Sequence, residues 1–351
     1  MTVLRGAFGC LLVLALASCS AGGEPQEARK PAPVAGEVNV YTARHYDSDL
    51  AIYDAFTAKT GIKVNIIEAG GDALIERLAR EAEASPADVF ITADAGMLWR
   101  AEKRGVLRPI EDPSILARVP AQFRDPQNEW VALSKRARVI IYDKARGVPE
   151  NLSTYDDLAS PAFLGEICVR SSTNVYNQSL LAGMIEHVGE AAAEVWARGV
   201  VANFARKPEG NDTSQIEAVA AGQCRVSIVN SYYLARYVGS DDRKMRAIGE
   251  KVAVIFPNQA TTGTHINISG AGVARYAANR ENAERLIAYL LSDAAQQAFA
   301  AGNNEYPVVE GLKPVGAVAA FGDFTADTVN MAALGEHQTE AVKIFDRVGW
   351  Q

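Results

Sequence analysis

The sequence predicts an α/β protein built from two doubly wound lobes. Short apolar, β-branched segments alternate with amphipathic segments of helical period, which is the pattern of parallel strands covered by helices. A chain of 351 residues, 48% of them hydrophobic, is long enough to bury the cores of two such lobes. A strand predicted at 139–142 separates a first set of β-α units from a second, and we interpret it as a crossing between the lobes.

The first lobe begins with a clear β-α-β unit. Its helix presents Leu50, Tyr53 and Phe56 on one face and ends at Gly61, a residue type that favours helix termination. The elements predicted for this part are strands at 37–41, 62–67 and 88–92 and helices at 47–60, 70–84 and 96–103. Helices at 281–291 and 293–300 follow later in the chain.

The second lobe repeats this pattern, with a return crossing predicted at 261–264. Its predicted elements are strands at 139–142, 167–170, 226–229 and 252–256 and helices at 176–187, 191–204, 214–221, 232–238 and 332–348. We therefore assign residues 37–138 and 262–315 to lobe 1, and residues 139–261 and 316–351 to lobe 2.

The N-terminus has the pattern of a targeting signal. Arg5 precedes an apolar run at 7–17 that is too short to span a bilayer and ends in Leu-Ala-Ser-Cys at 16–19. This ending is similar to a bacterial lipobox, which implies a signal peptide at 1–18, lipid on Cys19 and a membrane-anchored protein. An ordinary secretory leader with an incidental cysteine is the alternative. Residues 19–36, rich in Ala, Gly, Pro and Glu, read as a flexible tether.

Two cysteines remain in the folded part of the chain. Cys168 and Cys224 each lie at a short β-branched run, and an even number of cysteines in an exported protein favours a disulfide. Two buried free thiols are the alternative.

Composition and motifs exclude several functions. The net charge is -7 without a run of Lys or Arg, so nucleic acid is not an expected partner. The sequence lacks CxxC, HExxH and EF-hand motifs, so it predicts no soft-metal or calcium site of these types. It also lacks GxSxG, and no nucleophile, base and orienting group stand out, so we do not expect an enzyme.

Paired tyrosines follow the strand predicted at 226–229. Asn230 and Ser231 supply a turn and a helix N-cap, so Tyr232 and Tyr233 lie where a strand ends and a helix begins. In open α/β sheets, ligands bind at this edge, beside helix N-termini. Adjacent residues in a helical turn point in different directions, so core packing explains one of these tyrosines better than it explains both.

Two further tyrosines occupy the same kind of position. Tyr46 follows the first strand and Tyr176 follows the strand at 167–170. If the lobes face each other, all four phenols would line one cleft. Phenolate is a hard anionic donor, and Fe(III) can deprotonate a phenol, so the set points to a ferric site. His45, beside Tyr46, is either a further ligand or a solvated turn residue.

Seven short stretches carry a resemblance to a known family. They are YTARHY at 41–46, TGIKV at 60–64, SPADV at 85–89, ALSKRARV at 132–139, NSYY at 230–233, NISGAG at 267–272 and NEYP at 304–307. From about residue 38 to 351 the chain resembles the periplasmic ferric-iron-binding proteins of ABC importers. The resemblance implies a hinged, two-lobed periplasmic-binding-protein fold of type II.

The resemblance also implies a ligand set. It makes Tyr232 and Tyr233 iron ligands and places the His45–Tyr46 pair where the first lobe contributes. One branch of the family uses a glutamate where this sequence has Ala73, whereas Tyr176 is similar to a ligand of the tyrosine-rich, cyanobacterial-like branch. Four phenolates with optional His45 are therefore expected.

Two arginines are implied near this ligand set. Arg136 matches a family arginine that helps to hold an anion beside the iron. Around four phenolates, Arg136 and Arg44 would alternatively serve to balance charge.

The implied function is an extracytoplasmic receptor that carries Fe(III) as its transported ligand. It would be a lipid-anchored monomer of the periplasm or cell envelope, and its partners would be the permease and ATPase subunits of an ABC transporter. A binding protein of the same fold for an anion or small organic molecule is the alternative.

Overall fold

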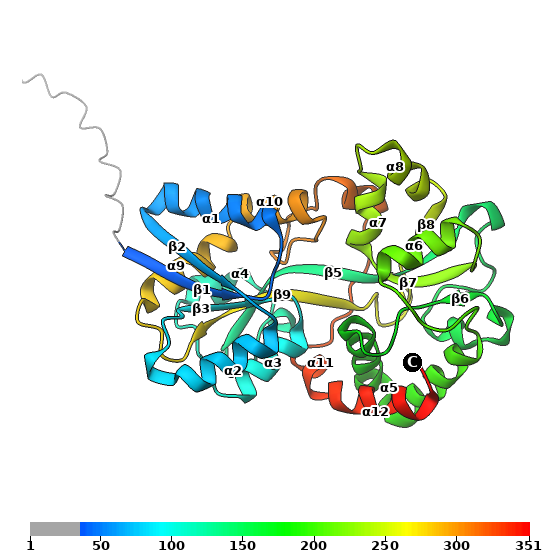
Figure 1. Cartoon of the computed structure of the whole chain (residues 1–351), viewed down its shortest axis with the longest axis horizontal. Coiled ribbons are helices and arrows are strands. Elements are labelled where there is room, and N and C mark those ends of the chain that lie inside the picture. The colour runs from blue at the N-terminus through cyan, green and yellow to red at the C-terminus, as the bar shows by residue number, and fades with distance from the viewer. Residues whose placement is uncertain (1–35) are drawn as a thin grey trace, which may run out of the picture. The chain divides into compact units, whose positions relative to one another are not determined.

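The computed structural model describes residues 36–351, and Figure 1 shows how the elements of this part are arranged. The signal peptide predicted at 1–18 and the predicted lipidation site, Cys19, lie outside the described residues, as does the tether predicted at 19–36 apart from Gly36. Within the described part, no helix is both long enough and apolar enough to cross a membrane.

The first half of the chain forms the elements expected of a doubly wound lobe. In order they are β1 (Gly36–Thr42), α1 (Asp47–Thr60), β2 (Ile62–Glu68), α2 (Gly71–Glu81), β3 (Val89–Thr92), α3 (Ala95–Lys103), β4 (Leu107–Arg108), α4 (Pro113–Arg118) and β5 (Trp130–Asp143). Most boundaries fall within two residues of those predicted, because Gly61 and Pro86 interrupt the periodic pattern at clear positions.

The remaining elements form the second half and a return to the first. They are β6 (Ile167–Cys168), α5 (Val175–Ala202), α6 (Asp212–Ala220), β7 (Val226–Asn230), α7 (Ser231–Val238), α8 (Arg243–Gly249), β8 (Val252–Ile255), β9 (Ile266–Ala274), α9 (Arg280–Leu290), α10 (Asp293–Asn303), α11 (Ala332–Glu336) and α12 (Gln338–Val348).

One continuous sheet joins the two halves. Its strand order is β2-β1-β3-β9-β5-β7-β6, with β4 paired to β9 and β8 paired to β5. Strand β5 belongs to both halves: Ala137 pairs with Ile266 of β9, whereas the next residue, Arg138, pairs with Asn230 of β7. Figure 1 shows β5 and β9 running side by side between the two groups of helices.

Three details of the crossing segments differ from the prediction. The crossing strand expected at 139–142 is much longer, and the return crossing expected at 261–264 is β9 instead. Residues 257–262 form a turn, in which the Gly263 N–H, at a φ of 86°, donates to the carbonyl of Asn258, and Thr264 makes an isolated bridge to Ala326. The helix expected at 332–348 is two helices, α11 and α12, separated at His337.

The cores follow this two-lobed arrangement. The first core contains Phe56, Phe90 and Trp130 and is continuous through the first half. In the second half, the second core contains Trp196 and Trp350, and the third core contains Val229 and the two cysteines of the folded part. The mixed α/β, two-lobed fold class is thereby confirmed.

The C-terminal segment contributes to both halves. Met331 and Leu334 pack in the first core, whereas Ile344 and Phe345 of α12 pack in the second core. Residues near α11 therefore form a third passage between the halves, in addition to β5 and β9.

Candidate metal centre

The start of α5 and the start of α7 bring three tyrosines together. Tyr176 is the second residue of α5, and Tyr232 and Tyr233 are the second and third residues of α7. The hydroxyls of Tyr176 and Tyr232 lie 3.2 Å apart. The rings of Tyr232 and Tyr233 stack with their centroids 4.4 Å apart. Three phenols thus come from two neighbouring helix N-termini, where the helix dipole favours negative charge.

Local sequence explains this placement. All five residues of β7 are buried, so the strand runs straight to Asn230 before the chain turns into α7. Strand β6 pairs with β7 in parallel, so both strands end at the same edge of the sheet. Asn174 caps α5 by accepting a hydrogen bond from the Tyr176 N–H at 3.0 Å.

A disulfide joins the segments that lead to these tyrosines. Cys168 of β6 is bonded to Cys224, two residues before β7, and their Cα atoms are 5.8 Å apart. Because β6 is only two residues long, its ladder with β7 is short, and the disulfide adds a covalent link to it.

Tyr46 comes from the first half of the chain. It precedes α1 at the N-cap position, where its side chain makes no capping hydrogen bond. The guanidinium of Arg44 lies over its ring, 4.8 Å from the centroid. Arg236 of α7 lies over three of the four rings, 5.8 Å from Tyr46, 5.0 Å from Tyr232 and 5.4 Å from Tyr233. The structure therefore brings Tyr46 up to the three tyrosines of the second half.

His45 is placed differently. Its side chain is 60% exposed, and Nδ1 lies 3.7 Å from the Oε2 atom of Glu68 at the end of β2. Within residues 36–351, its ring makes no hydrogen bond to any of the four tyrosines. In this arrangement His45 is a solvated neighbour of the tyrosine cluster.

Arg136 is a buried cation without a carboxylate. It is 2% exposed, and among the described residues no Asp or Glu oxygen lies within 4 Å of it. Its Nη1 donates to Ser269 at 3.3 Å, its Nη2 donates to the carbonyl of Ala93, and its guanidinium lies 5.6 Å from the Tyr176 ring. Burial opposes its charge, but Tyr176 and Tyr232, together with the more distant Glu305 and Tyr46, outweigh burial and raise the pKa of Arg136.

Arg44 has a different environment from Arg136. Its Nε donates to Asp49 at 2.7 Å, and its Nη2 donates to Glu305 at 3.1 Å. Ser134 accepts from its Nη1 at 3.3 Å. Two carboxylates therefore fix this guanidinium against the Tyr46 ring, so Arg44 holds Tyr46 in place.

Burial keeps the phenols of Tyr46, Tyr232 and Tyr233 protonated in the metal-free protein at neutral pH, because it raises the pKa of each. Burial, followed by the charge of Glu305, raises the pKa of Tyr46 to about 12. Burial and the neighbouring phenols of Tyr176 and Tyr46 raise the pKa of Tyr232 well above 10. A bound cation would have to displace these protons, and a trivalent ion does so more readily than a divalent one.

A buried ionic network supports the three tyrosines of the second half. Asp212, fully buried at the start of α6, pairs with Arg138 at 2.6 Å and with Arg170 at 3.0 Å. Asp212 also accepts the N–H of Asn230 at 2.7 Å. Both guanidiniums lie over the Tyr176 ring, at 5.9 and 5.3 Å. The network thus connects the end of β7 to the start of α5.

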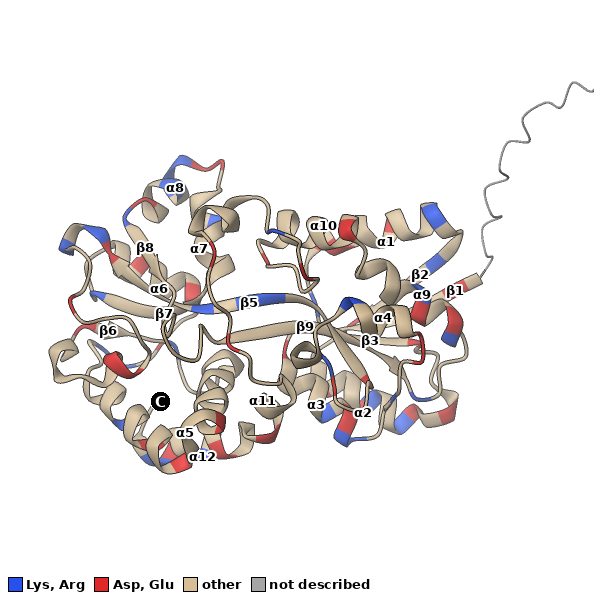
Figure 2. Cartoon of the chain, turned by 180° about the vertical axis from the view of Figure 1, so that it is seen from behind, with Lys and Arg blue, Asp and Glu red and all other residues tan. Residues whose placement is uncertain are grey.

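Figure 2 shows basic positions along the middle of β5, where it passes between the halves. Three of the four residues at 135–138 are basic: Lys135, Arg136 and Arg138. Their side chains have different neighbours. Arg138 joins the second-half network, Arg136 faces the phenols, and Lys135 has neither of these partners.

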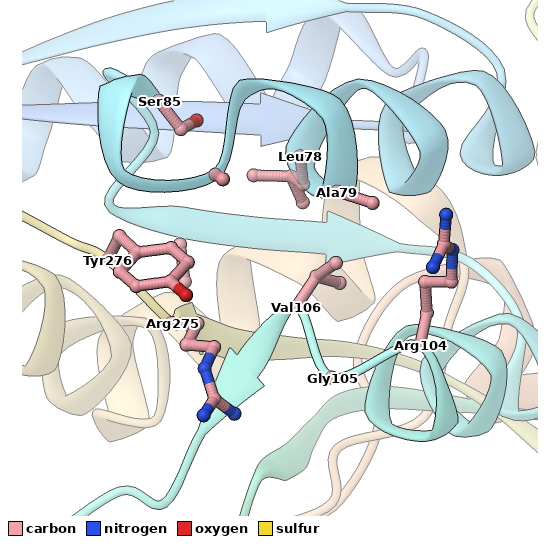
Figure 3. A pocket seen from close by; sticks show the side chains of 10 residues that line it. Leu78, Ala79, Ser85, Arg104, Gly105, Val106, Arg275 and Tyr276 are labelled. Atoms are coloured by element: carbon pink, nitrogen blue, oxygen red, sulfur yellow. The ribbon is translucent and has the colours of Figure 1, made fainter.

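The described residues offer no second metal site of the usual His, Cys, Asp and Glu type. In residues 36–351, no group of three or more His, Cys, Asp and Glu side chains is arranged to hold a metal ion. A cavity of 380 Å³ in the first half is lined by Arg104, Arg275 and Tyr276, among others (Figure 3). None of the four predicted tyrosine ligands lines it.

A cavity between the halves adjoins the cluster. It has a volume of 450 Å³ and is lined by Asp94 and Arg100 from the first half and by Val175 and Gln178 from the second. Tyr232 is only 2% exposed, whereas Tyr46, Tyr176 and Tyr233 are half-buried and remain partly open to solvent.

Several supporting residues were not predicted from the sequence. Asp212, Glu305 and Arg236 have no local pattern that marks them, since their partners lie far away in the chain. Glu305 lies in one of the stretches that carry the family resemblance, which was the only available signal. Arg236 lies one helical turn after Tyr232 and Tyr233, a spacing that places it beside the same rings.

Two α/β halves that share one sheet, with a cluster of ligand-type side chains between them, define a solute-binding protein of the periplasmic-binding-protein fold. Residues 84–321 match the family of bacterial extracellular solute-binding proteins, and the chain belongs to that family.

Several members of this family that are similar to the chain have names that refer to iron. Iron uptake protein A1 of Synechocystis sp. is 46% identical over 315 residues, which cover 90% of this chain and 88% of that protein. A structure of Trichodesmium IdiA (FutA) in complex with iron and citrate ligands is 51% identical, with a TM-score of 0.87, and covers 90% of this chain and 100% of that one. A ferric binding protein from Campylobacter jejuni is 39% identical, with a TM-score of 0.83 and coverage of 90% and 100%.

Proposed function

We propose that this protein captures Fe(III) between its two lobes and delivers it to the permease of an ABC importer. The ligands would be the phenolate oxygens of Tyr46, Tyr176, Tyr232 and Tyr233. The observation that carries the proposal is the meeting of these four phenols, from both halves, beside a buried arginine that has no carboxylate partner.

The charges around the phenols suit a ferric ion. Four phenolates exceed the charge of Fe(III) by one, and a cation in the second layer would offset the difference. Arg136 is buried within reach of Tyr176, and its pKa is raised by the phenols. Arg44 is already paired with Asp49 and Glu305, so Arg136 is better suited than Arg44 to balance the site or to hold an anion.

The two lobes would close on the ion by a hinge in the crossing strands. We assign lobe 1 to residues 37–138 and 262–315, and lobe 2 to residues 139–261 and 316–351. Two segments depart from this division: Tyr306 packs in a core of the second half, and Met331 and Leu334 pack in the core of the first half. The change of partner between Ala137 and Arg138 in β5 supports the first of these boundaries. His45 would remain outside the shell or join it only through a rearrangement, because its ring now faces Glu68.

The visible spectrum tests this proposal directly. Purified protein loaded with Fe(III) should be orange to red, because phenolate-to-iron charge transfer absorbs visible light. A colourless protein, or one whose colour does not depend on these tyrosines, would overturn the ferric assignment. Tight binding of a small organic solute by a colourless protein would favour a different cargo for the same fold.

Membrane attachment is a separate part of the proposal. Cys19 would carry lipid and anchor a monomeric receptor to the cell envelope, next to the permease and ATPase subunits. A Cys19→Ser variant should then appear in the soluble fraction or remain unprocessed. Unchanged membrane fractionation of this variant would contradict the anchor and leave the iron site untouched.

A further inference from the structure

A cavity at the hinge is lined by residues from both halves of the protein. It has a volume of 230 Å³, and its lining includes Lys135, Tyr306, Leu312, Phe324 and Ala326. Leu312 and Ala326 pack against the first core, whereas Tyr306 and Phe324 pack with the third core in the second half. We call this cavity the hinge pocket.

Lys135 places an unpaired positive charge at the hinge pocket. Its ammonium has no hydrogen-bond acceptor and no carboxylate within 4 Å among the described residues. The Nζ atom of Lys135 lies over the ring of Phe123, 5.2 Å from its centroid. Burial lowers the pKa of Lys135, and the more distant Glu310 only partly opposes this effect. A half-buried ammonium without a carboxylate partner would be stabilised by an anion bound beside it.

The walls of the hinge pocket are held firmly. Lys135 and Tyr306 exchange two backbone hydrogen bonds, of 2.9 and 2.7 Å. The Tyr306 ring meets Phe324 edge to face at 5.0 Å, and Phe324 stacks on Phe256 at 4.5 Å. Pro307 and Pro314 also line the cavity. The pocket therefore combines one cationic group with rigid apolar surfaces, which is the usual composition of a small-molecule site.

We propose that the hinge pocket binds a small monocarboxylate with an apolar body. The carboxylate would accept a charge-assisted hydrogen bond from Lys135, and the body would lie against Leu312 and Phe324. The volume is below the roughly 300 Å³ at which pockets for drug-sized ligands begin, so the ligand is fragment-sized. The exposed carboxylate of Asp323 also lines the pocket and would disfavour a second negative charge on the ligand.

A ligand at this place would influence lobe movement. The two walls belong to different cores, so a change in the angle between the lobes would change the shape of the pocket. A carboxylate that fits one lobe arrangement better than another must alter the affinity of the cleft for its cargo, and the cargo must alter the affinity for the carboxylate by the same factor. In the cargo-free protein, carboxylate binding can be measured whatever the cargo of the cleft is.

Calorimetric titration of iron-free mature protein with hexanoate tests the proposal. Lys135→Met keeps the length and apolar character of the side chain and removes only the charge. We expect Lys135→Met to weaken hexanoate binding by about tenfold or more, which is the usual effect of losing a charge-assisted hydrogen bond. The matched control is Lys313→Met. Lys313 is exposed and lies between the pocket residues Leu312 and Pro314 without lining the pocket, so this variant should bind hexanoate like the parent.

The chemistry of the ligand is tested with two further probes. 1-Hexanol and hexylamine have the same apolar body without the carboxylate, and both should bind at least tenfold more weakly than hexanoate. The proposal is overturned if hexanoate does not bind at millimolar concentration, or if it binds to the parent and to Lys135→Met equally.

Iron loading of the same samples separates this proposal from the proposed function. Lys135→Met should keep the colour of the iron complex, because the Lys135 side chain makes no contact with the four tyrosines of the cluster. A coloured protein that ignores hexanoate overturns the hinge pocket alone. A protein that binds hexanoate through Lys135 but never becomes coloured supports the hinge pocket and overturns the ferric assignment.

Discussion

The two lobes contribute to the tyrosine cluster in unequal ways. The second lobe supplies Tyr176, Tyr232 and Tyr233 from two adjacent helix starts, and a disulfide links the segments leading to them. The first lobe supplies only Tyr46, which lies at the end of one loop. Three of the four proposed ligands therefore belong to one lobe, and the other lobe would add a single ligand.

The buried charges differ in the same sense. In the second lobe, Asp212 bridges two arginines below the Tyr176 ring and fixes the end of β7. In the first lobe, one arginine, Arg44, is shared by Asp49 and Glu305 and positions one ring. If these phenols hold the ion, the second lobe would bind it before closure, whereas the first lobe would contribute only after closure.

Removal of the paired phenolates should have the largest effect. Tyr232→Phe or Tyr233→Phe keeps the stacked ring and deletes only the oxygen donor, so each should abolish tight iron binding and most of the visible colour. Tyr237→Phe is a matched control on the same helix, because its hydroxyl contacts Glu217 at 2.7 Å and not the cluster. Iron titration followed by absorbance makes the measurement. If Tyr232→Phe and Tyr233→Phe both bind like the parent, the paired tyrosines serve packing and the ferric assignment fails.

Removal of the phenolate of the first lobe should have a smaller effect. Tyr46→Phe leaves the three donors of the second lobe, so we expect a weaker complex that is still coloured. Closure should also be impaired, since the ion would no longer be bound by both lobes. Small-angle scattering with and without iron measures closure. Equal loss of colour in Tyr46→Phe and Tyr232→Phe would show that the two lobes contribute equally to iron binding, which would contradict a dominant second lobe.

Removal of the disulfide should weaken the second lobe more than the first. A Cys168→Ser, Cys224→Ser double variant should lose about 2 to 5 kcal/mol of unfolding free energy, as is usual for such bridges. Denaturant unfolding of the metal-free protein measures the loss, and thiol labelling of the unreduced parent after unfolding checks that no free cysteine is present. Two reactive thiols in the mature parent would contradict the bridge.

Periodic and punctuated parts of the sequence were the predictable ones. The boundaries of α1 follow from the spacing of its apolar residues and from Gly61. Tyr53 and Phe56 are buried as expected, but Leu50, predicted on the same face, is 50% exposed. The ends of β1, β6 and β7 predicted where the tyrosines would gather. The return crossing was misplaced because 261–264 and β9 are both rich in small and β-branched residues, and only pairing with β5 distinguishes them. Residues whose partners are distant in sequence, such as Asp212 and Glu305, leave no local pattern at all.

The orientation of a single side chain was also beyond sequence reasoning. His45 and Tyr46 are adjacent and both were candidate ligands, yet one ring faces Glu68 and the other faces Arg44 and Arg236. This choice depends on Arg44, whose own position is set by carboxylates from α1 and from the segment after α10. The pattern of residue types therefore locates the site, and tertiary contacts decide which side chains enter it.

The smallest predicted effect concerns a histidine between the two lobes. His265 precedes β9, is 4% exposed, and contacts Ser179 of α5 at 3.3 Å. Burial first, and then the positive charges of Arg138, His187 and Arg136, lower its pKa from 6.5 to about 3. The folded protein therefore keeps His265 neutral at a pH where the unfolded chain takes up a proton.

The sign of the pH effect on stability follows from this difference. The unfolded state binds more protons between about pH 6.5 and 3, so the stability present above pH 6.5 is lost as the pH falls through this window. At about 1.4 kcal/mol per pH unit, His265 should cost roughly 2 kcal/mol between pH 6.5 and 5. A His265→Gln variant should lose less stability over that interval than the parent, whereas His45→Gln, which changes an exposed histidine, should follow the parent. Denaturant unfolding at both pH values provides the comparison, and parallel pH dependence in all three proteins would show that His265 is not the group responsible.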